Sequence, residues 1–401
     1  MIFPSLIDGL ARTVSIKRGK NCRNDSGREA AEALAKSARK NELMLSTSGI
    51  VKSNKSSNFA SVCSKRGQKG INQDCAIVWE EFGCQEDMVF CGIFDGHGPW
   101  GHVVAKRVRE SVPYSLLCNW QETLLSSTSP AMNLDLDGNR NVPQYDIWNQ
   151  SCLKTYAAID QELKQHTGID SFRSGTTALT IVKQGENLVV ANVGDSRAVL
   201  ATLSDDGDLV PFQLTIDFKP NIPEEAERIT QSKGLVFCLN DEPGVYRVWM
   251  PNGETPGLAM SRALGDYCVK DYGLISVPHV TQRNITTRDQ FVILASDGVR
   301  IHKLELSFDL NLRQCLKDQL WIVLQVWDVI SNQEAVEIVS SVVDREKAAK
   351  RLVECAVRAW KYKKRGIAMD DISAICLFFH SSSSPQKVEH NLKDSKLQAG
   401  I

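Results

Sequence analysis

Short apolar runs that we predict to be strands meet aspartates at one end, and this repeated pattern is the strongest constraint on the fold. Four such runs are flanked in this way: Met88–Phe94 before Asp95, Leu188–Val193 before Asp195, Phe291–Ala295 before Asp297, and Ile372–Phe379 after Asp370-Asp371. A shorter run, Ala76–Trp79, lies just after Asp74. One Asp-Gly pair after a strand is usually only a turn. Its repetition indicates strands that aim several carboxylates at a common point.

Helical patterns separate these strands, and tight turns join some of them in pairs. The helical stretches are Gly101–Cys118, Tyr145–Gln165, Pro223–Lys233, Glu334–Val342 and Glu346–Lys364. Only five residues, which end in a Gly-Glu-Asn turn, separate the strands Thr177–Val182 and Leu188–Val193, which favours antiparallel pairing. We therefore predict an α+β fold of antiparallel sheets with packed helices, rather than a repeated βαβ unit.

Composition divides the chain into one central domain and two tails. Residues 1–57 carry eleven Lys or Arg against five Asp or Glu and are rich in Ser, Asn and Gly, which predicts a flexible basic N-terminal tail. Its charge suits either a solvated leader or contact with an anionic partner or membrane surface. Residues 381–401 are predicted to be a polar C-terminal tail, and 58–380 the central domain.

The overall charge and the cysteines exclude several classes of protein. A formal net charge of -1 over 401 residues argues against a dedicated nucleic-acid binder. No apolar stretch approaches the roughly 18–20 residues that span a bilayer, so no integral membrane association is expected. The 12 cysteines are scattered without zinc-site spacing, as in reduced intracellular proteins. We expect a monomer in the cytoplasm, the nucleus or both.

Clustered carboxylates need a cation, because like charges at close range raise each other's pKa. With no Cys/His ligand set, an all-oxygen site indicates a hard ion, Mg²⁺ or Mn²⁺. Two such ions activate a water molecule and hold the oxygens of a hydrolytic or phosphoryl-transfer reaction. Gly96 beside Asp95 allows a backbone carbonyl to approach the same ions, and His97 is the candidate acid for the leaving oxygen.

Six ordered motifs resemble those of the metal-dependent protein phosphatase 2C family, and most closely its plant members. The motifs are Asp95-Gly96-His97-Gly98, Ser174-Gly175-Thr176-Thr177-Ala178, Gly194-Asp195-Ser196-Arg197, the stretch Leu258–Asp266, Ser296-Asp297-Gly298 and Asp370-Asp371-Ile372-Ser373. The resemblance covers about residues 58–380. It implies a four-layer α-β-β-α sandwich of two antiparallel sheets flanked by helices.

The resemblance also implies an activity and a set of site residues. The activity is hydrolysis of phosphoserine and phosphothreonine in signalling phosphoproteins by water activated between two metal ions, with no phosphoenzyme. The positions matching the metal ligands are Asp74, Asp95, Asp297 and Asp370, with the carbonyl of Gly96. Asp195 and Asp328 match ligands of a weaker third ion, His97 the general acid, and Tyr246–Ser261 the flap that faces the substrate.

Two positions near the first aspartate depart from the family pattern. Lys69 stands where the family has a phosphate-binding Arg, so the charge is kept but the bidentate fork is lost. Gln73 replaces a Glu that often precedes Asp74 and removes one carboxylate from the surroundings of the site.

A larger departure interrupts the fifth motif. Without the 27 residues 299–325, the sequence would read Ser-Asp-Gly-Val-Trp-Asp-Val, as in the family. In this chain, Trp327-Asp328 follows only after the insert. One hypothesis is a translated intron, since Val299-Arg300 and Leu324-Gln325 can be encoded by splice-like codons. The alternative is a true surface loop, which costs only about 2–3 kcal/mol of closure entropy. Because the insert begins two residues after Asp297, the rival function is a catalytically impaired, phosphatase-like binding protein.

Overall fold

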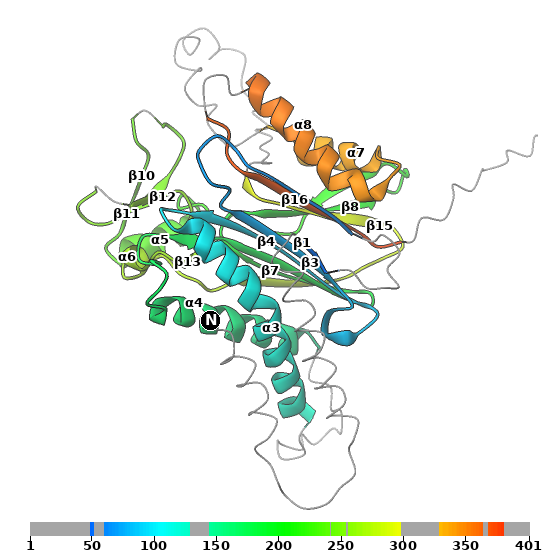
Figure 1. The fold of residues 1–401 in the computed structure, drawn as a ribbon, viewed down its shortest axis with the longest axis horizontal. Helices are drawn as coiled ribbons and strands as arrows, with labels where there is room; N and C mark the ends of the chain where they lie inside the picture. Colours follow the sequence, from blue (N-terminus) through cyan, green and yellow to red (C-terminus); the bar gives the residue numbers. More distant parts are fainter. Residues whose placement is uncertain are drawn as a thin grey trace, which may run out of the picture.

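The computed structural model describes residues 49–51, 60–128, 144–240, 242–253, 256–297, 329–363 and 368–380. Two β-sheets lie face to face, and helices cover both outer faces (Figure 1). The predicted C-terminal tail, the insert 299–325 and most of the predicted N-terminal tail fall outside the described residues. Residues 49–51 correct the tail boundary, because they form a strand instead of continuing the tail.

The first sheet has the strand order β1-β3-β4-β6-β7-β14. Its members are β1 (Gly49–Val51), β3 (Asp74–Glu80), β4 (Met88–His97), β6 (Ala178–Gln184), β7 (Asn187–Val193) and β14 (His279–Asn284). Two short strands, β5 (Gly175–Thr176) and β13 (Leu264–Gly265), continue it beside the end of β4. Pairing is antiparallel throughout except between β1 and β3, which run parallel.

The second sheet has the order β2-β16-β15-β8-β9 and is antiparallel throughout. Its members are β2 (Ala60–Lys65), β16 (Ile372–Phe378), β15 (Asp289–Ala295), β8 (Arg197–Leu203) and β9 (Leu209–Gln213). β2 and β16 pair although they lie about 310 residues apart, so this sheet joins the two ends of the predicted central domain.

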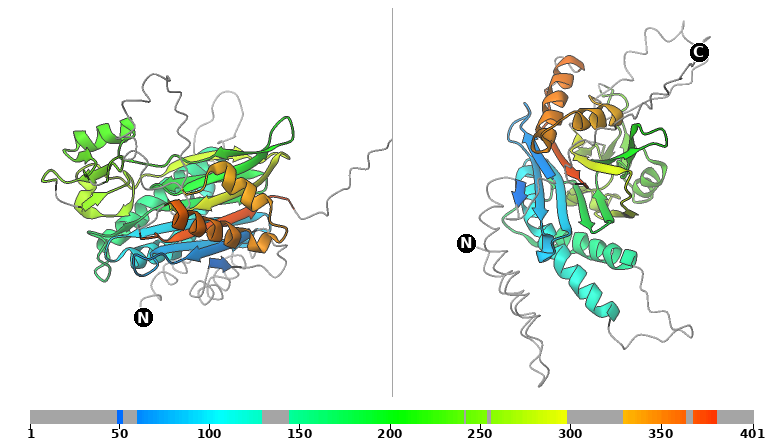
Figure 2. Two further views of the ribbon diagram at one scale, coloured as in Figure 1. Left: turned by 90° about the horizontal axis from the view of Figure 1, so that it is seen from above. Right: turned by 90° about the vertical axis from the view of Figure 1, so that its right-hand side faces the viewer.

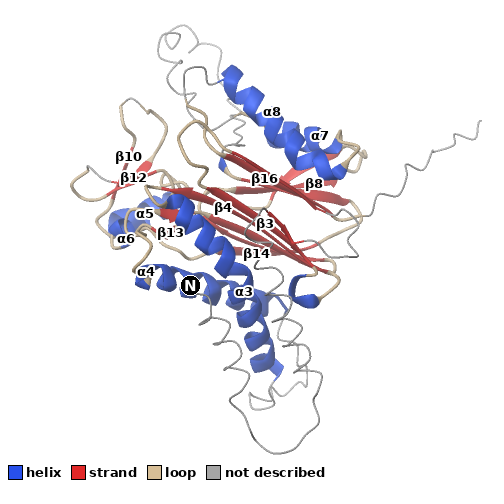
Figure 3. Cartoon of the chain, viewed as in Figure 1, coloured by secondary structure: helices blue, strands red, loops and turns tan. Residues whose placement is uncertain are grey.

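Helices form the two outer layers (Figure 3). α3 (Gly101–Thr128) and α4 (Gln144–Gln165) pack on the first sheet, and α7 (Asn332–Ser340) and α8 (Ala348–Lys363) on the second. Short 3-10 turns lie at Phe82–Cys84 and Arg345–Lys347. In the part of the chain that the structure describes, no helix combines the length and apolarity needed to cross a bilayer.

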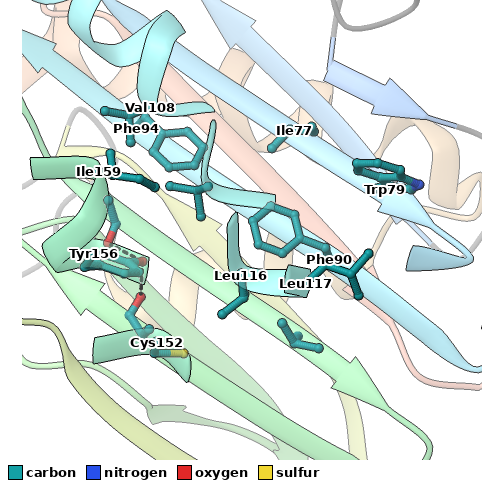
Figure 4. Close-up of a cluster of buried hydrophobic side chains, with 14 of the residues drawn as sticks. Ile77, Trp79, Phe90, Phe94, Val108, Leu116, Leu117, Cys152, Tyr156 and Ile159 are labelled. Carbon is teal, nitrogen blue, oxygen red and sulfur yellow. Dashed lines mark hydrogen bonds between the residues drawn. The ribbon is translucent and has the colours of Figure 1, made fainter. Parts of the chain in front are cut away.

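The period-two alternation of the strands explains the layering. In β4, Phe90 and Phe94 pack toward α3 and α4, whereas Cys91 and Ile93 face the second sheet. Figure 4 shows the helix side of this sheet, where Phe94 lies among side chains such as Val108. The strands β3, β4, β6 and β7 therefore each contribute to two separate apolar layers.

The second sheet divides its side chains in the same way. Phe291 and Ile293 of β15 pack with α7 and α8, and Val292 and Leu294 face the first sheet. One apolar core thus lies between the sheets and one lies under each helical layer. The predicted α+β sandwich of four layers, α-β-β-α, is confirmed (Figure 2).

A small subdomain projects beyond one end of the sandwich (Figure 1). It contains a three-stranded sheet of β10 (Leu235–Phe237), β11 (Arg247–Trp249) and β12 (Pro256–Leu258), with helices α5 (Pro223–Gln231) and α6 (Tyr267–Lys270). Its own apolar cluster includes Ile229, Val248 and Val269. The subdomain contains the stretch predicted to be the flap, Tyr246–Ser261, apart from residues 254 and 255, which are not described.

Candidate metal centre

Asp74 and Asp95 lie directly opposite each other on neighbouring strands of the first sheet. Asp74 is the first residue of β3, and Asp95 is near the end of β4. Thr177 holds the backbone of Asp95 from the other side: its hydroxyl accepts from the Asp95 N–H at 3.0 Å, and its N–H donates to the Asp95 carbonyl at 2.9 Å. The Ser-Gly-Thr-Thr motif therefore fixes the position of an aspartate that is 82 residues away.

The second sheet brings Asp297 and Asp370 to the same edge through the pairing of β15 with β16. Ser296 connects the two sheets there. Its N–H donates to the Ser373 carbonyl at 3.1 Å, and its hydroxyl donates to Asp74 Oδ2 at 2.9 Å. The Ser-Asp-Gly motif thus places one carboxylate and also ties the second sheet to a carboxylate of the first.

Asp371 organises the loop that carries Lys69, a role that was not predicted from the sequence. Its carboxylate accepts from the N–H of Gly67 at 2.7 Å and from that of Gln73 at 2.8 Å. The two adjacent aspartates could be seen in the sequence, but they have different contacts. Asp371 binds backbone N–H groups, whereas Asp370 contacts Lys69. Lys69 Nζ lies 2.6 Å from Asp370 Oδ2, so the predicted phosphate-binding cation contacts a predicted metal ligand.

The protonation of these groups reflects the gathered negative charge. Burial and the charges of Asp74, Asp297 and Asp370 raise the pKa of Asp95 well above its ordinary value. Burial also raises the pKa of Asp74 to about 7, against the opposing hydrogen bonds from Ser373 and Ser296. Burial alone would lower the pKa of Lys69, but the Asp370 carboxylate raises it.

The donor set fits a hard divalent cation. Asp74 Oδ1 is a buried carboxylate oxygen with no hydrogen-bond partner among the described residues. The carboxylates around it raise each other's pKa, which a cation would reverse. Within the described ranges, no three His, Cys, Asp or Glu side chains are already arranged around a common point at metal-binding distances. Instead, Lys69 donates to one oxygen of Asp370, and Ser296 donates to one oxygen of Asp74.

Gly96 lies where the backbone of β4 passes closest to the start of α3. A Cβ at this position would be 2.4 Å from the carbonyl oxygen of Gly101 and 2.8 Å from that of Gln73. A side chain would therefore separate the strand from the helix. Glycine at this position has a packing reason that is independent of any ion.

His97, the last residue of β4, contacts Asp266. The distance from His97 Nε2 to Asp266 Oδ2 is 2.6 Å. Burial alone would lower the pKa of His97, but the charge and hydrogen bond of Asp266 raise it. Asp266 is the last residue of the Leu258–Asp266 motif, and no role was predicted for it.

Asp195 is buried and forms an ion pair with Lys219, whose Nζ lies 2.5 Å from Asp195 Oδ2. The family resemblance implies a ligand of a third ion at Asp195, whereas the contact with Lys219 was not predicted. The charge of Asp195 also acts on Asp95 and His97. Asp328, the other predicted ligand of the third ion, lies outside the described residues.

Comparisons with known proteins identify the family of the chain. The sequence profile of the family described as "Protein phosphatase 2C" matches residues 60–300. "Probable protein phosphatase 2C 73" of Arabidopsis thaliana is 61% identical over 97% of each chain, and "Probable protein phosphatase 2C 34" of the same plant is 59% identical over 95% of this chain and 98% of its own.

Among solved structures, the serine-threonine phosphatase 2C of Toxoplasma gondii superposes with a TM-score of 0.63 at 25% identity, over 80% of this chain and 94% of that one. The profile match and the plant relatives each cover more than half of the chain. The chain belongs to the protein phosphatase 2C family of metal-dependent protein serine/threonine phosphatases, as a plant-type member.

Proposed function

We propose that this chain hydrolyses phosphoserine and phosphothreonine in phosphoproteins with two bound Mg²⁺ or Mn²⁺ ions and a weaker third. The ligands proposed for the two principal ions are Asp74, Asp95, Asp297 and Asp370, with the carbonyl of Gly96. Asp195 and Asp328 are proposed for the third ion. The match of the family profile and the metal dependence of the family support this assignment.

The observation that carries the proposal is the pairing of Asp74 with Asp95 at the edge where the two sheets meet. The Asp74 carboxylate is buried and the Asp95 carboxylate is half-buried, and both have a raised pKa. A structural role would favour neutral or ion-paired side chains at such a place, because an uncompensated buried charge destabilises the fold. Cation binding would compensate the negative charge of these two carboxylates, and it is the function that explains why they lie side by side.

Each group of residues has a proposed part in the reaction. When bound, the divalent ions supply a water nucleophile near neutral pH and neutralise phosphoryl charge. Lys69, whose Nζ contacts Asp370, is proposed to bind a phosphate oxygen as well. His97 is proposed to donate a proton to the serine or threonine oxygen as the phosphorus–oxygen bond breaks.

The direct test is hydrolysis of a phosphothreonine peptide by the full chain. We expect no activity in EDTA and activity after addition of Mg²⁺ or Mn²⁺, because the carboxylates need the cations. Activity that persists in EDTA would contradict the metal-dependent mechanism. Bound metal without hydrolysis would favour the rival, a catalytically impaired binding protein.

The insert 299–325 is tested by deleting it. We expect the full chain to be active and the deleted chain to be faster, because the deletion joins Asp297-Gly298 to Trp327-Asp328 as in the family motif. Activity in the deleted chain alone would identify the full chain as a defective form.

Sequencing the transcript tests the intron hypothesis separately, since a continuous genomic sequence without splice signals would leave only the loop. The family profile match ends at residue 300, near the predicted start of the insert.

Lys69 provides a third test. Lys69→Met should lower kcat/KM for the phosphopeptide about 10- to 100-fold, because charge-assisted hydrogen bonds to phosphate are among the strongest polar contacts. Lys69→Arg should retain most of the activity, since it keeps the charge and restores the fork of the family residue. Equal losses in both variants would indicate that Lys69 acts through its contact with Asp370 and does not bind substrate phosphate.

The oligomeric state, the location and the partners of the protein are also proposed. We propose a monomer in the cytoplasm, the nucleus or both, acting on phosphoproteins and not on nucleic acid. The formal net charge of -1 supports the exclusion of nucleic acid. Sedimentation equilibrium and microscopy of a tagged full chain would test the oligomeric state and the location.

A further inference from the structure

The contact between His97 and Asp266 joins two segments that are 169 residues apart in the sequence. His97 ends β4, and Asp266 lies between β13 and α6. The side chain of Asp266 is only 3% exposed, and its Oδ2 lies 2.6 Å from His97 Nε2. Such a short contact between a half-buried ring and a buried carboxylate needs both segments to be held accurately.

The backbone of Asp266 is held in a conformation that residues other than glycine rarely adopt. Its φ and ψ angles are 55° and 46°, in the left-handed region. Its N–H donates to the carbonyl of Ser174 at 3.0 Å. A strained conformation at a buried residue persists where the surrounding structure determines it, and it is concentrated at functional sites.

Asp160 of α4 anchors the residues on both sides of Asp266. Its carboxylate accepts from the Gly265 N–H at 2.9 Å, from Lys270 Nζ at 3.1 Å and from the Ser276 hydroxyl at 3.0 Å. The Tyr267 hydroxyl donates to the Asp160 carbonyl. The helix therefore fixes the segment that presents Asp266 to His97.

Gly175 leaves the space that the Asp266 carboxylate occupies. A Cβ at position 175 would lie 2.0 Å from Asp266 Oδ2. Any larger residue would displace the carboxylate from His97. The motif therefore needs glycine at position 175, because only glycine leaves room for the contact between Asp266 and His97.

We infer that Asp266 is a positioning residue, which orients the His97 ring so that Nδ1 faces the reaction. The inference rests on the proposed function. With Nε2–H donated to Asp266, Nδ1 is the remaining ring nitrogen, and it is buried with no hydrogen-bond partner among the described residues. In the protonated ring the Nδ1–H bond breaks and an O–H bond forms on the leaving serine or threonine oxygen, which takes the electron pair of the broken phosphorus–oxygen bond. Asp266 keeps its hydrogen bond to Nε2–H throughout.

The test compares two leaving groups in Asp266→Asn. On a phosphothreonine peptide, whose alkoxide must be protonated, kcat should fall about 10- to 100-fold with little change in KM. On p-nitrophenyl phosphate, whose leaving group is stable without a proton, kcat should fall less than about threefold. Equal losses on both substrates, or no loss on either, would overturn the inference. A wild-type chain inactive on both would instead reject the proposed function.

Further variants separate positioning from a general loss of structure. In a His97→Asn background, Asp266→Asn should have no added effect on the peptide, because it acts only through the ring. Gly175→Ala should show the same leaving-group dependence as Asp266→Asn. Asp289→Asn is the matched control, since Asp289 is also buried and ion-paired but lies at the far end of β15, and it should leave the ratio of the two rates unchanged. Additive losses in the double variant would mean that Asp266 acts independently of His97.

A measurement on the wild-type chain avoids variants that fail to fold. The 15N spectrum of the histidine rings, with Mg²⁺ present, should show His97 protonated at Nε2 with a slowly exchanging proton. A neutral His97 ring protonated only at Nδ1 would overturn the inference.

Discussion

Asp95→Asn is expected to abolish phosphatase activity, with a loss of about 1,000-fold or more on a phosphothreonine peptide. Metal ions contribute several kcal/mol to the stabilisation of transition-state charge, and about 4 kcal/mol corresponds to that factor. The charges of Asp74, Asp297, Asp370 and Asp195 all act on Asp95. Steady-state kinetics over a range of Mn²⁺ concentrations measure the loss.

The same variant should be as stable as the wild type or more stable when both are in EDTA. The raised pKa of Asp95 means that its charged form is disfavoured in the folded chain, so removing the charge relieves repulsion. Asp289→Asn is the matched control and should be destabilised, because hydrogen bonds from Thr286 and the charge of Arg283 lower the pKa of Asp289 despite its burial. A strong loss of thermal stability in Asp95→Asn would contradict a metal-binding role and indicate a structural one.

Glu225→Gln is expected to destabilise the projecting subdomain by about 3 kcal/mol at pH 7, because breaking a buried ion-pair network leaves charges uncompensated. Glu225 Oε1 accepts from Arg228 Nη1 and from Arg262 Nη2, each at 2.7 Å, and Ser261 donates to Oε2 at 2.5 Å. These contacts join α5 to the segment that follows β12. Urea denaturation, combined with hydrogen exchange over β10–β12, measures the effect.

The effect of Glu225→Gln should depend on pH. Burial alone would raise the pKa of Glu225, but the hydrogen bonds from Arg228, Arg262 and Ser261 lower it to about 2. A lowered pKa stabilises the fold above the ordinary value, and this contribution is lost as pH falls from about 4.5 to about 2. The two chains should therefore converge in stability over that range.

The control for Glu225 is Glu224→Gln, one residue earlier in α5 and exposed. It should change stability by less than about 0.5 kcal/mol, as surface substitutions usually do. A similar loss in both variants, or a difference that does not change with pH, would contradict the role of the buried network.

The sequence predicted the longer helices and the strands β3, β4, β6, β7, β15 and β16, because these have strong local patterns. β6 and β7 alternate around a tight turn at Gly185, whose positive φ of 55° suits glycine. The amphipathic helix α8 was expected from its spacing alone. β2, β8, β9 and β14 are among the strands that were not predicted, because their apolar runs are short or interrupted by polar residues. Of these, β2, β8 and β14 pair with strands that are distant in the sequence.

The candidate site was predicted in part. The four aspartates that follow or precede strands could be found from local sequence, and the described structure brings their segments to one edge. Ser296, Lys219 and Asp266 were missed as partners, because each acts on a residue between 24 and 222 positions away. A local pattern carries no information about such contacts.

By itself, the sequence determined which residue types stand at the ends of which strands, and thereby the chemistry that the chain can perform. Only the tertiary structure decided which carboxylates face each other. The β3–β4 register sets Asp74 opposite Asp95, and the Ser296 hydroxyl links the second sheet to Asp74. A shift of one residue in that register would turn every side chain of a strand to its other face. Packing on both faces of the first sheet excludes that shift, because the alternating side chains fill two different apolar cores.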